Sequence, residues 1–468
     1  MQTADEAELA KLGYRQELRR GLGAFGSFAL AFSIISVLTG AVQLYGWGLK
    51  HGGPIGVVGG WVLVSLLTLP MALSMAQLAS AYPTAGALYH WATILGGRQW
   101  GFATAWLNTL GQVAITASID FGMAQLVCGL TGLGDRQSVV LPVYALILAS
   151  HAGLNHIGVG VVEVLNRISA WYHLLGVAAV VGVLAAVAPL QPVAFLAKTA
   201  TVDGSVAMGL ALALLQAQWT FTGYDASAHV TEETHDPTRA APKGIVLSVV
   251  VSAVAGLALV VVVTLAIADL PAVMRLADAE VFPAVLKQAL GPQLGGALVW
   301  MCVGAMWFCG LGSLTSNSRM LYAFARDGGV PKARLVAAVS AKFQTPHIAL
   351  WICAIAAFVL ALWAEAYAAM TALSTIALYA SYALPVWLGA RAKQRGTWRH
   401  FGPFALGRWS APLNALAVGW TLVVMVLFVL PPNQLAGYTF AGTIGALVVY
   451  WFGSQRATFA PPVKGLDA

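Results

Sequence analysis

Charged residues are scarce in this sequence: Asp, Glu, Lys and Arg make up 9% of its 468 residues, whereas 59% of the residues are hydrophobic. A soluble domain normally carries about a quarter charged residues, because its surface must face water. Apolar stretches of about twenty residues, long enough to cross a bilayer as a helix, recur along the chain. The composition therefore excludes an ordinary soluble protein and predicts an integral membrane protein.

The chain also lacks the short motifs that mark many enzymes. It has no glycine-rich phosphate loop, no zinc-type spacing of His and Cys and no serine nucleophile elbow. No ATPase sequence is present to drive primary transport. The four cysteines lie in or near apolar stretches and indicate neither disulfides nor a metal site. We therefore expect a protein that is not an enzyme and that needs no cofactor and no metal.

Basic residues are distributed unevenly between the two sides of the predicted membrane. Residues 1–22 lack the basic-then-apolar pattern of a secretory signal, so we expect a retained cytoplasmic tail. With that tail inside, about twenty Lys and Arg residues fall on the same side and about five on the other. The net charge of +7 thus indicates orientation and not nucleic-acid binding. We expect a multi-pass protein of the cell membrane with both termini in the cytoplasm.

The fold predicted from these stretches is an all-α integral membrane protein with about twelve transmembrane helices. Residues 1–22 and 456–468 form the predicted tails, and residues 23–455 form one transmembrane domain. The predicted spans are 23–48, 54–80, 98–130, 138–155, 160–187, 206–231, 243–268, 288–317, 346–363, 367–391, 410–431 and 436–455.

Small polar residues interrupt two of these spans. Residues 36–40 read SVLTG within the first span, and residues 219–225 read WTFTGYD within the sixth. A helix in hydrocarbon has no reason to carry such residues unless its backbone opens there around something polar. Each break lies about fifteen residues into its span, roughly 20 Å along the helix. Two broken helices in corresponding positions of two halves predict the binding site of a secondary transporter.

Five segments carry a further pattern: SFALAFSIISVLTG, LASAYPTAGALYHWA, LNTLGQVAITASIDFG, FTGYDASAHVTEETHDPTRAAPKGI and NSRMLYAFARDGGVP. They resemble the amino acid–polyamine–organocation permeases, and within that superfamily the amino acid/choline transporter branch. The resemblance covers about residues 12–455. It implies the five-plus-five inverted-repeat core of the sodium-coupled leucine transporter, here about residues 23–187 and 206–391, with two extra helices in about 410–455. It also implies alternating access, in which one helix bundle rocks against the other.

The first break offers a place for a substrate carboxylate. A half-helix that starts there leaves backbone N–H groups free at its positive end. Gly40 allows close approach, and the hydroxyls of Ser36 and Thr39 are further donors. Hydrogen bonds from these hydroxyls to their own helix are the alternative. We predict substrate binding by Ser36, Val37, Leu38, Thr39 and Gly40.

Aromatic residues surround the second break and can hold an ammonium group by cation–π attraction. The resemblance implies that Trp219 matches a tryptophan of the family's binding pocket. For the other aromatic residues of this break, ordinary packing is the alternative. We predict substrate binding here by Trp219, Phe221, Thr222, Gly223 and Tyr224. Weaker candidates lie at similar depth in the third, eighth and tenth spans: Gln112, Trp307 and Thr375, with Asn108, Phe308 and Ser374 beside them.

Coupling and gating require ionisable groups. In the resemblance, His173 stands where many proton-coupled relatives carry a lysine, and histidine binds a proton near neutral pH. Asp120 is an alternative proton carrier, and Asp225 is expected to pin the broken helix or a gate. The departure from lysine leaves uniport, exchange and sodium coupling open. Charged residues near the ends of the sixth and eighth spans predict an inner gate of ion pairs: Glu232, Glu233, Arg239, Lys243, Arg319, Arg326 and Asp327.

The resulting interpretation is a secondary active transporter of a small amino acid or related amine that works by alternating access with proton coupling. Choline or a polyamine is the alternative substrate, and exchange or uniport the alternative mode. A channel or a nutrient sensor on the same scaffold is a rival class. A channel should show a filter loop or a ring of charges, and a sensor should carry a long signalling extension.

Overall fold

The computed structural model describes residues 4–202, 204–362 and 366–462. Within these ranges the chain forms helices, and its one isolated β-bridge joins Leu22 to Thr234. Residues 1–3 and 463–468 of the predicted tails, and residues 363–365 where the ninth and tenth predicted spans meet, lie outside the described residues.

In the described ranges, nine helical stretches are long and apolar enough to cross a membrane. They are formed by α2 (Ala24–Ile35), α3 (Val37–Ala81), α5 (Arg98–Thr131), α6 (Gln137–Ile157), α7 (Val159–Val187), α10 (Pro237–Leu265), α12 (Asp278–Arg326), α15 (Ala366–Gln394), α16 (Ser410–Leu427) and α17 (Gln434–Tyr450). Two shorter apolar helices, α8 (Val206–Thr220) and α14 (His347–Leu360), lie where the sixth and ninth spans are predicted. The first stretch contains two predicted spans, so the nine stretches and the two shorter helices together account for the predicted spans. The all-helical multi-pass fold is therefore confirmed.

Shorter elements connect these helices or lie at the ends of the molecule. The α-helical ones are α1 (Ala4–Lys11), α4 (Leu88–Gly96), α9 (Ala226–His229), α11 (Leu270–Val273), α13 (Ala333–Val336) and α18 (Arg456–Thr458). The 3₁₀ turns are η1 (Val193–Ala197), η2 (Thr231–Glu233) and η3 (Gly407–Trp409), and η4 (Trp451–Gln455) is π-helical. The break in the sixth span lies between α8 and α9.

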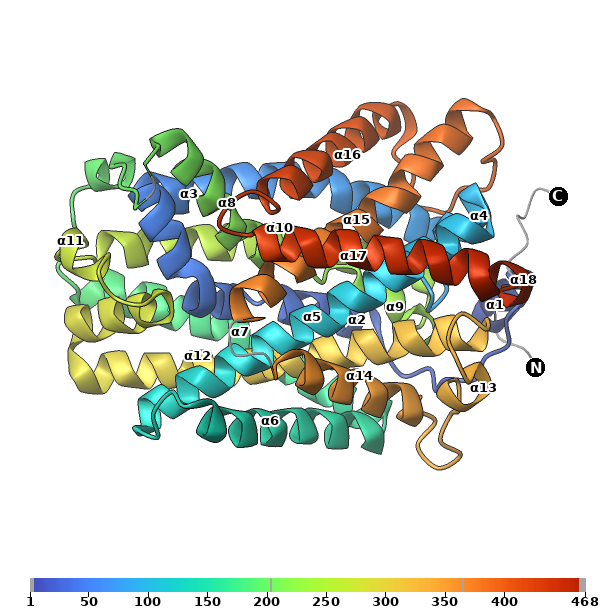
Figure 1. Cartoon of the computed structure of the whole chain (residues 1–468), viewed down its shortest axis with the longest axis horizontal. Helices are drawn as coiled ribbons and strands as arrows, with labels where there is room; N and C mark the ends of the chain where they lie inside the picture. Colours follow the sequence, from blue (N-terminus) through green and yellow to red (C-terminus); the bar gives the residue numbers. More distant parts are fainter. Residues whose placement is uncertain (1–3, 203, 363–365, 463–468) are drawn as a thin grey trace.

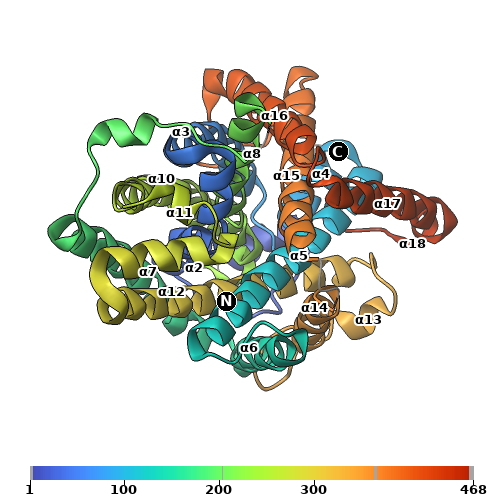
Figure 2. The same ribbon diagram turned by 60° about the vertical axis from the view of Figure 1, so that its left-hand side comes forward.

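The long helices run side by side along the longest axis of the molecule, and both termini lie at the same end of the bundle (Figure 1). We call this end the terminal end. Helix α17 lies at the edge of the bundle (Figure 2), and only 6% of the apolar stretch that contains it is buried. Such an apolar surface suits contact with lipid.

Glycine–proline pairs bend two of the long helices. In α3, Gly53 has a φ of 68° before Pro54, so residues 37–52 complete the first span and residues 54–81 form the second. In α12, Gly291 has a φ of 81° before Pro292, so a connecting helix precedes the eighth span. That span extends to Arg326, beyond its predicted end at residue 317. Proline lacks an N–H and glycine tolerates positive φ, which makes each pair a natural corner.

Candidate functional site

The chain opens at both predicted breaks. Ser36 has a left-handed backbone, with a φ of 34°, and separates α2 from α3. In the sixth span, α8 ends at Thr220 and α9 begins at Ala226, with Gly223 at a φ of 87° between them. The interruption of both helices confirms the prediction that small polar residues mark openings of the backbone.

The two breaks touch each other. A Cβ atom placed on Gly40 would overlap the side chain of Thr220, which ends α8. A Cβ atom on Gly223 would likewise overlap Ile34, just before the first break. The first and sixth spans therefore lie against each other at their breaks, and a side chain at either glycine would force its neighbour to move.

Hydrogen bonds among side chains organise the first break. The Ser36 hydroxyl oxygen accepts from the Thr39 amide at 3.3 Å and lies 2.6 Å from the Thr39 hydroxyl. The amides of Val37 and Leu38 are the other donors of the first turn of α3, where a helix leaves its N–H groups without internal partners. This geometry agrees with the predicted positive helix end.

His173 of α7 bonds directly to the first break. Its Nδ1 lies 2.8 Å from the Ser169 carbonyl oxygen, which can only accept, so Nδ1 carries a hydrogen. Its Nε2 lies 2.7 Å from the Ser36 hydroxyl, which can donate to it. A neutral ring satisfies both contacts. The predicted titratable group therefore lies at the first break, and its role in coupling stays a prediction.

Tyrosines of α15 satisfy the backbone that the second break exposes. The Tyr379 hydroxyl donates to the Phe221 carbonyl at 2.6 Å, and the Gly223 amide donates to the Tyr382 hydroxyl at 3.2 Å. The Thr222 hydroxyl instead bonds to the Trp219 carbonyl of its own segment at 2.7 Å. Sequence reasoning did not assign Tyr382 a role, since no local pattern links it to the sixth span.

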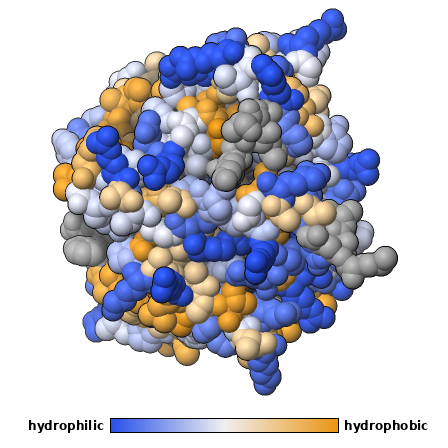
Figure 3. Space-filling view, turned by 90° about the vertical axis from the view of Figure 1, so that its right-hand side faces the viewer, coloured by the Kyte–Doolittle hydropathy of each residue, from blue (hydrophilic) through white to orange (hydrophobic). Residues whose placement is uncertain are grey.

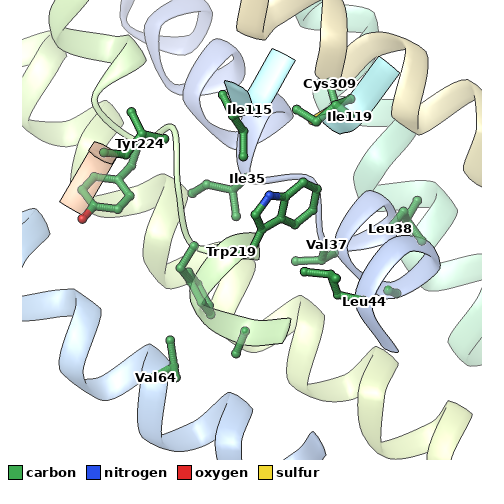
Figure 4. Packing of buried hydrophobic residues seen from close by; sticks show 14 of the residues in the cluster. Ile35, Val37, Leu38, Leu44, Val64, Ile115, Ile119, Trp219, Tyr224 and Cys309 are labelled. Atoms are coloured by element: carbon green, nitrogen blue, oxygen red, sulfur yellow. The ribbon is translucent and has the colours of Figure 1, made fainter. Parts of the chain in front are cut away.

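Trp219 lies between the two breaks. Figure 4 shows its indole ring extending from α8 toward Ile35 and Val37 of the first break and Ile115 of α5. The side chain is buried, and its indole N–H has no hydrogen-bond partner among the described residues. A buried donor without an acceptor is costly, so a bound acceptor at this point would be stabilised.

Asp225 connects the second break to two other helices. Tyr382 of α15 donates to its Oδ1 at 2.8 Å, and Asn108 of α5 donates to its Oδ2 at 3.1 Å. The same Oδ2 lies 3.2 Å from Nε2 of His229, one turn along α9. Gln112 reaches this network indirectly, by donating to Asn108 Oδ1 at 3.0 Å. The predicted pinning role of Asp225 therefore has a concrete basis in these bonds.

The remaining predicted site residues face other partners. The Thr375 hydroxyl donates to the Thr371 carbonyl of its own helix at 3.1 Å. The indole of Trp307 donates to Ser150 of α6 at 3.1 Å. Asp120 is buried in α5, with its Oδ2 3.0 Å from Nδ1 of His151. Within the described ranges, neither Thr375 nor Trp307 makes a hydrogen bond to a break.

Two buried ion pairs lie at the terminal end. The Arg319 guanidinium donates to both carboxylate oxygens of Glu233 at 3.0 and 3.1 Å, and Arg326 donates to both of Glu232 at 3.0 and 2.9 Å. Burial favours the neutral form of Glu232, but Arg326 outweighs it and holds the pKa of that carboxyl below its ordinary value. Arg239 pairs with Asp236 at the surface and not with the glutamates.

The segment before α2 packs against the same ion pairs. The amides of Gly21 and Leu22 donate to the Glu233 carbonyl at 2.9 and 2.8 Å, and the Gln16 amide donates to the Glu232 carbonyl at 2.7 Å. Hydrophilic side chains cover much of this end of the molecule (Figure 3). After α1, the second half of the predicted tail therefore folds against the terminal end.

A second polar cluster lies beside this segment. The hydroxyls of Tyr14 and Tyr89 both donate to Asp327 Oδ2, at 2.7 and 2.8 Å, and His90 Nε2 lies 3.0 Å from the same oxygen. Burial and the Asp327 carboxylate raise the pKa of Tyr14 above its ordinary value, so this hydroxyl stays protonated and donates. Burial also lowers the pKa of His90, which favours its neutral form. The cluster thus joins the tail to α4 and to the end of α12.

The structure is a bundle of membrane-length helices, two of which are broken where they touch around a buried centre, and it has ion pairs at one end. This is the architecture of a multi-pass permease. The chain belongs to the amino acid permease family, because the model of that family, described as "Amino acid permease", matches residues 22–453. The family is one of transporters and not of enzymes, and it confirms the resemblance seen in the sequence.

Named relatives extend this similarity over almost the whole chain. The chain is similar to the amino-acid permease BAT1 of Arabidopsis thaliana, at 36% identity over 98% of this chain and 96% of the relative. A BAT1 homolog of Oryza sativa subsp. japonica is 36% identical over the same shares of the two chains. A GABA-specific permease of Saccharomyces cerevisiae is 25% identical over 92% of this chain and 80% of its own length.

Proposed function

We propose that this protein is a secondary active transporter that moves a small amino acid or related amine across the cell membrane by alternating access, driven by protons. One observation carries the proposal: the first and sixth spans break where they touch, and the buried indole donor of Trp219 between them has no hydrogen-bond partner among the described residues. Broken helices that meet in the middle of a membrane bundle are suited to hold a polar solute.

The substrate carboxylate is placed at the start of α3, where the helix end is positive and the Val37 and Leu38 amides are donors. Its amine is placed near the aromatic wall of the sixth span. The names of the relatives support an amino acid, and one is a GABA-specific permease. Choline or a polyamine is the second candidate, because Trp219, Tyr224 and Tyr379 lie near the second break and one relative is named a putative amino acid/polyamine transporter.

Orientation follows from the charge distribution. The terminal end carries the tail, both ion pairs and the chain termini, and the positive-inside rule places the more basic side in the cytoplasm. We therefore place the terminal end in the cytoplasm and its ion pairs at the inner gate.

The decisive experiment begins with a thermal-shift screen of the purified protein against amino acids, 4-aminobutyrate, choline and polyamines. A ligand that binds only the folded state raises the melting temperature. Saturable uptake of the same compound into proteoliposomes, driven by a pH gradient, would support the proposal. Flux without saturation would indicate a channel, and binding without flux would indicate a sensor. Binding and uptake of choline or a polyamine alone would favour the second candidate.

Replacing Trp219 by Phe keeps an aromatic ring and removes the unpartnered N–H. We expect KM for a carboxylated substrate to rise about 10- to 100-fold, since a hydrogen bond to a charged group contributes about 1.5–3 kcal/mol. Uptake by Trp409→Phe, at an exposed tryptophan, provides the control. An unchanged KM in Trp219→Phe would remove this donor from the site.

Replacing His173 by Ala tests proton coupling. If a proton binds Nε2, the Ser36 hydroxyl must accept from His173, and its own hydrogen becomes free to donate to a substrate carboxylate. We therefore expect His173→Ala to lose accumulation driven by a pH gradient and to keep substrate exchange. His235→Gln, at an exposed histidine, is the control. Normal pH-driven accumulation in His173→Ala would leave Asp120 or Asp225 as the carrier.

A further inference from the structure

His229 and Asp225 form a contact that the proposed substrate site does not explain. His229 Nδ1 lies 3.0 Å from the carbonyl oxygen of Ala85, in the connection between α3 and α4. Its Nε2 lies 3.2 Å from Asp225 Oδ2, and both side chains are buried. The carboxylate also accepts from Asn108 and from Tyr382. Every polar atom of the pair therefore has a neighbour.

This contact needs one more hydrogen than a neutral histidine beside a carboxylate can supply. The Ala85 carbonyl only accepts, so Nδ1 of His229 must carry a hydrogen. A neutral ring then presents a bare Nε2 to Asp225, and two lone pairs would face each other at 3.2 Å. The contact needs a proton either on Nε2, as an imidazolium, or on Oδ2, as a carboxylic acid.

The partners of Asp225 do not remove this requirement. Tyr382 accepts from the Gly223 amide, so its own hydrogen goes to Asp225 Oδ1. Asn108 donates to Oδ2 through its amide nitrogen. Both neighbours thus meet Asp225 as donors, and each bond exists whether the extra proton is on the acid or on the ring.

Three other buried histidines, His173, His151 and His90, meet the contacts described here without an extra proton. His173 lies between a carbonyl and a hydroxyl that can donate. His151 faces Asp120 with one nitrogen and has no partner for the other. His90 faces Asp327 with one nitrogen, and its other nitrogen meets a threonine hydroxyl that can donate or accept. His229 differs because a carbonyl and a carboxylate occupy its two sides.

The arginines near the pair already have carboxylate partners. The buried or half-buried ionisable groups around it are Glu232 with Arg326, Glu233 with Arg319, His90 beside Asp327, and the tyrosines Tyr224, Tyr379 and Tyr382, whereas Arg239 and Lys243 of α10 are exposed. None of these arginines makes an ion pair with Asp225. Without its proton, the Asp225–His229 pair would be a buried charge with no counter-ion, which is costly until water reaches it.

We infer that Asp225 and His229 together bind one proton, and that this proton keeps the terminal end closed. The pair lies on the unwound sixth span, whereas its donors Asn108 and Tyr382 lie on α5 and α15. Loss of the proton to water leaves a carboxylate and a neutral imidazole with a net charge of minus one. Opening the terminal end hydrates this charge, so deprotonation favours opening. The gating role rests on the proposed function, but proton binding does not.

Proton binding is tested by titrating the detergent-purified protein between about pH 6 and about pH 9, where histidine pairs exchange protons. His229→Gln keeps an amide that can donate to Asp225 but cannot titrate in this range. We expect this variant to release about one proton fewer per chain than the parent. The ¹⁵N NMR signals of labelled histidine or the carboxyl infrared band then show whether ring or acid holds it. Equal proton release by variant and parent overturns the inference.

Gating is tested with the variant Ser227→Cys, whose cysteine is labelled by a membrane-impermeant maleimide added on the terminal side. Ser227 lies on α9 and is buried, with its hydroxyl bonded to the Ser27 carbonyl, so it reacts only when this end opens. The substitution Ser227→Cys is made both in the parent and in His229→Gln. We expect the parent to be labelled about tenfold more slowly than His229→Gln at about pH 6, and at the same rate at about pH 9. The ratio cancels the pH dependence of the thiol itself. A constant ratio overturns the gating role.

A third variant keeps the inference testable if His229→Gln does not fold. Tyr382→Phe removes one donor from Asp225 and leaves His229 in place. A carboxylate that has lost a donor is less stable in its charged form, so the midpoint of the plot of labelling rate against pH should move to higher pH. An unmoved midpoint contradicts the inference. His235→Gln, at an exposed histidine, should retain the parental profile, and the measurement needs no transported substrate.

Discussion

Uptake of labelled substrate by the Gly40→Leu variant is expected to fall at least about 100-fold, because displacements of about 1 Å in a site commonly cost that much activity. The added side chain would overlap Thr220 and force the first and sixth spans apart where their breaks touch. The substrate donors at the start of α3 would then no longer face the indole of Trp219. Initial uptake rates in proteoliposomes, normalised to inserted protein, measure the effect.

Gly59→Leu is the matched control on the same helix. A Cβ atom there meets only Ile55, at 3.7 Å, and the position is exposed on the outside of the bundle. We expect this variant to insert and transport like the parent. Gly40→Ala should lose less uptake than Gly40→Leu, since its added group is smaller. Parental uptake in both Gly40 variants would show that the two spans need not touch there.

Loss of the Glu233 carboxylate is expected to destabilise the protein by about 3–5 kcal/mol, because it leaves a buried guanidinium without its counter-ion. The side chains of Arg319 and Glu233 are 0% and 1% exposed, and the bond between them is bidentate. Glu233→Leu should therefore lower the melting temperature of the purified protein strongly. Melting followed in detergent measures the change.

The double variant Glu233→Leu, Arg319→Met distinguishes charge from shape. Apolar replacement of both partners removes the uncompensated charge, so we expect most of the lost stability to return. Lys11→Met is the control, since it breaks an exposed pair with Glu8 that contributes about 0–1 kcal/mol. If the double variant melts as early as Glu233→Leu, packing of the glutamate and not the ion pair is responsible.

The breaks were predictable from sequence because their cause is local. Ser36 and Gly223 stand among small polar residues in apolar spans, and the helices open at both positions. The partners of the breaks were not predictable in the same way. Tyr382 and Asn108 reach Asp225 across 157 and 117 residues of chain, and no periodicity in one span reports such a contact.

The terminal end shows the same limit. Glutamates at the end of the sixth span indicated ion pairs, but Arg239, the nearest downstream cation in sequence, pairs with Asp236. The actual partners are Arg319 and Arg326, 86 and 94 residues away on α12, which were predicted gate residues but were not assigned to particular glutamates. His229 had a local signal that was missed, since it follows Asp225 by four residues and therefore shares its helical face.

The tyrosines of α15 have a consequence for the affinity of the carrier. Tyr379 and Tyr382 hold the carbonyl and amide that the second break exposes, so the open backbone has its partners before any solute arrives. If this segment wound into a regular helix, both hydroxyls would lose these bonds. The entropy cost of ordering the break is therefore met during folding, and the solute meets a preorganised backbone. Weak polar contacts with a small solute can then suffice for selective binding.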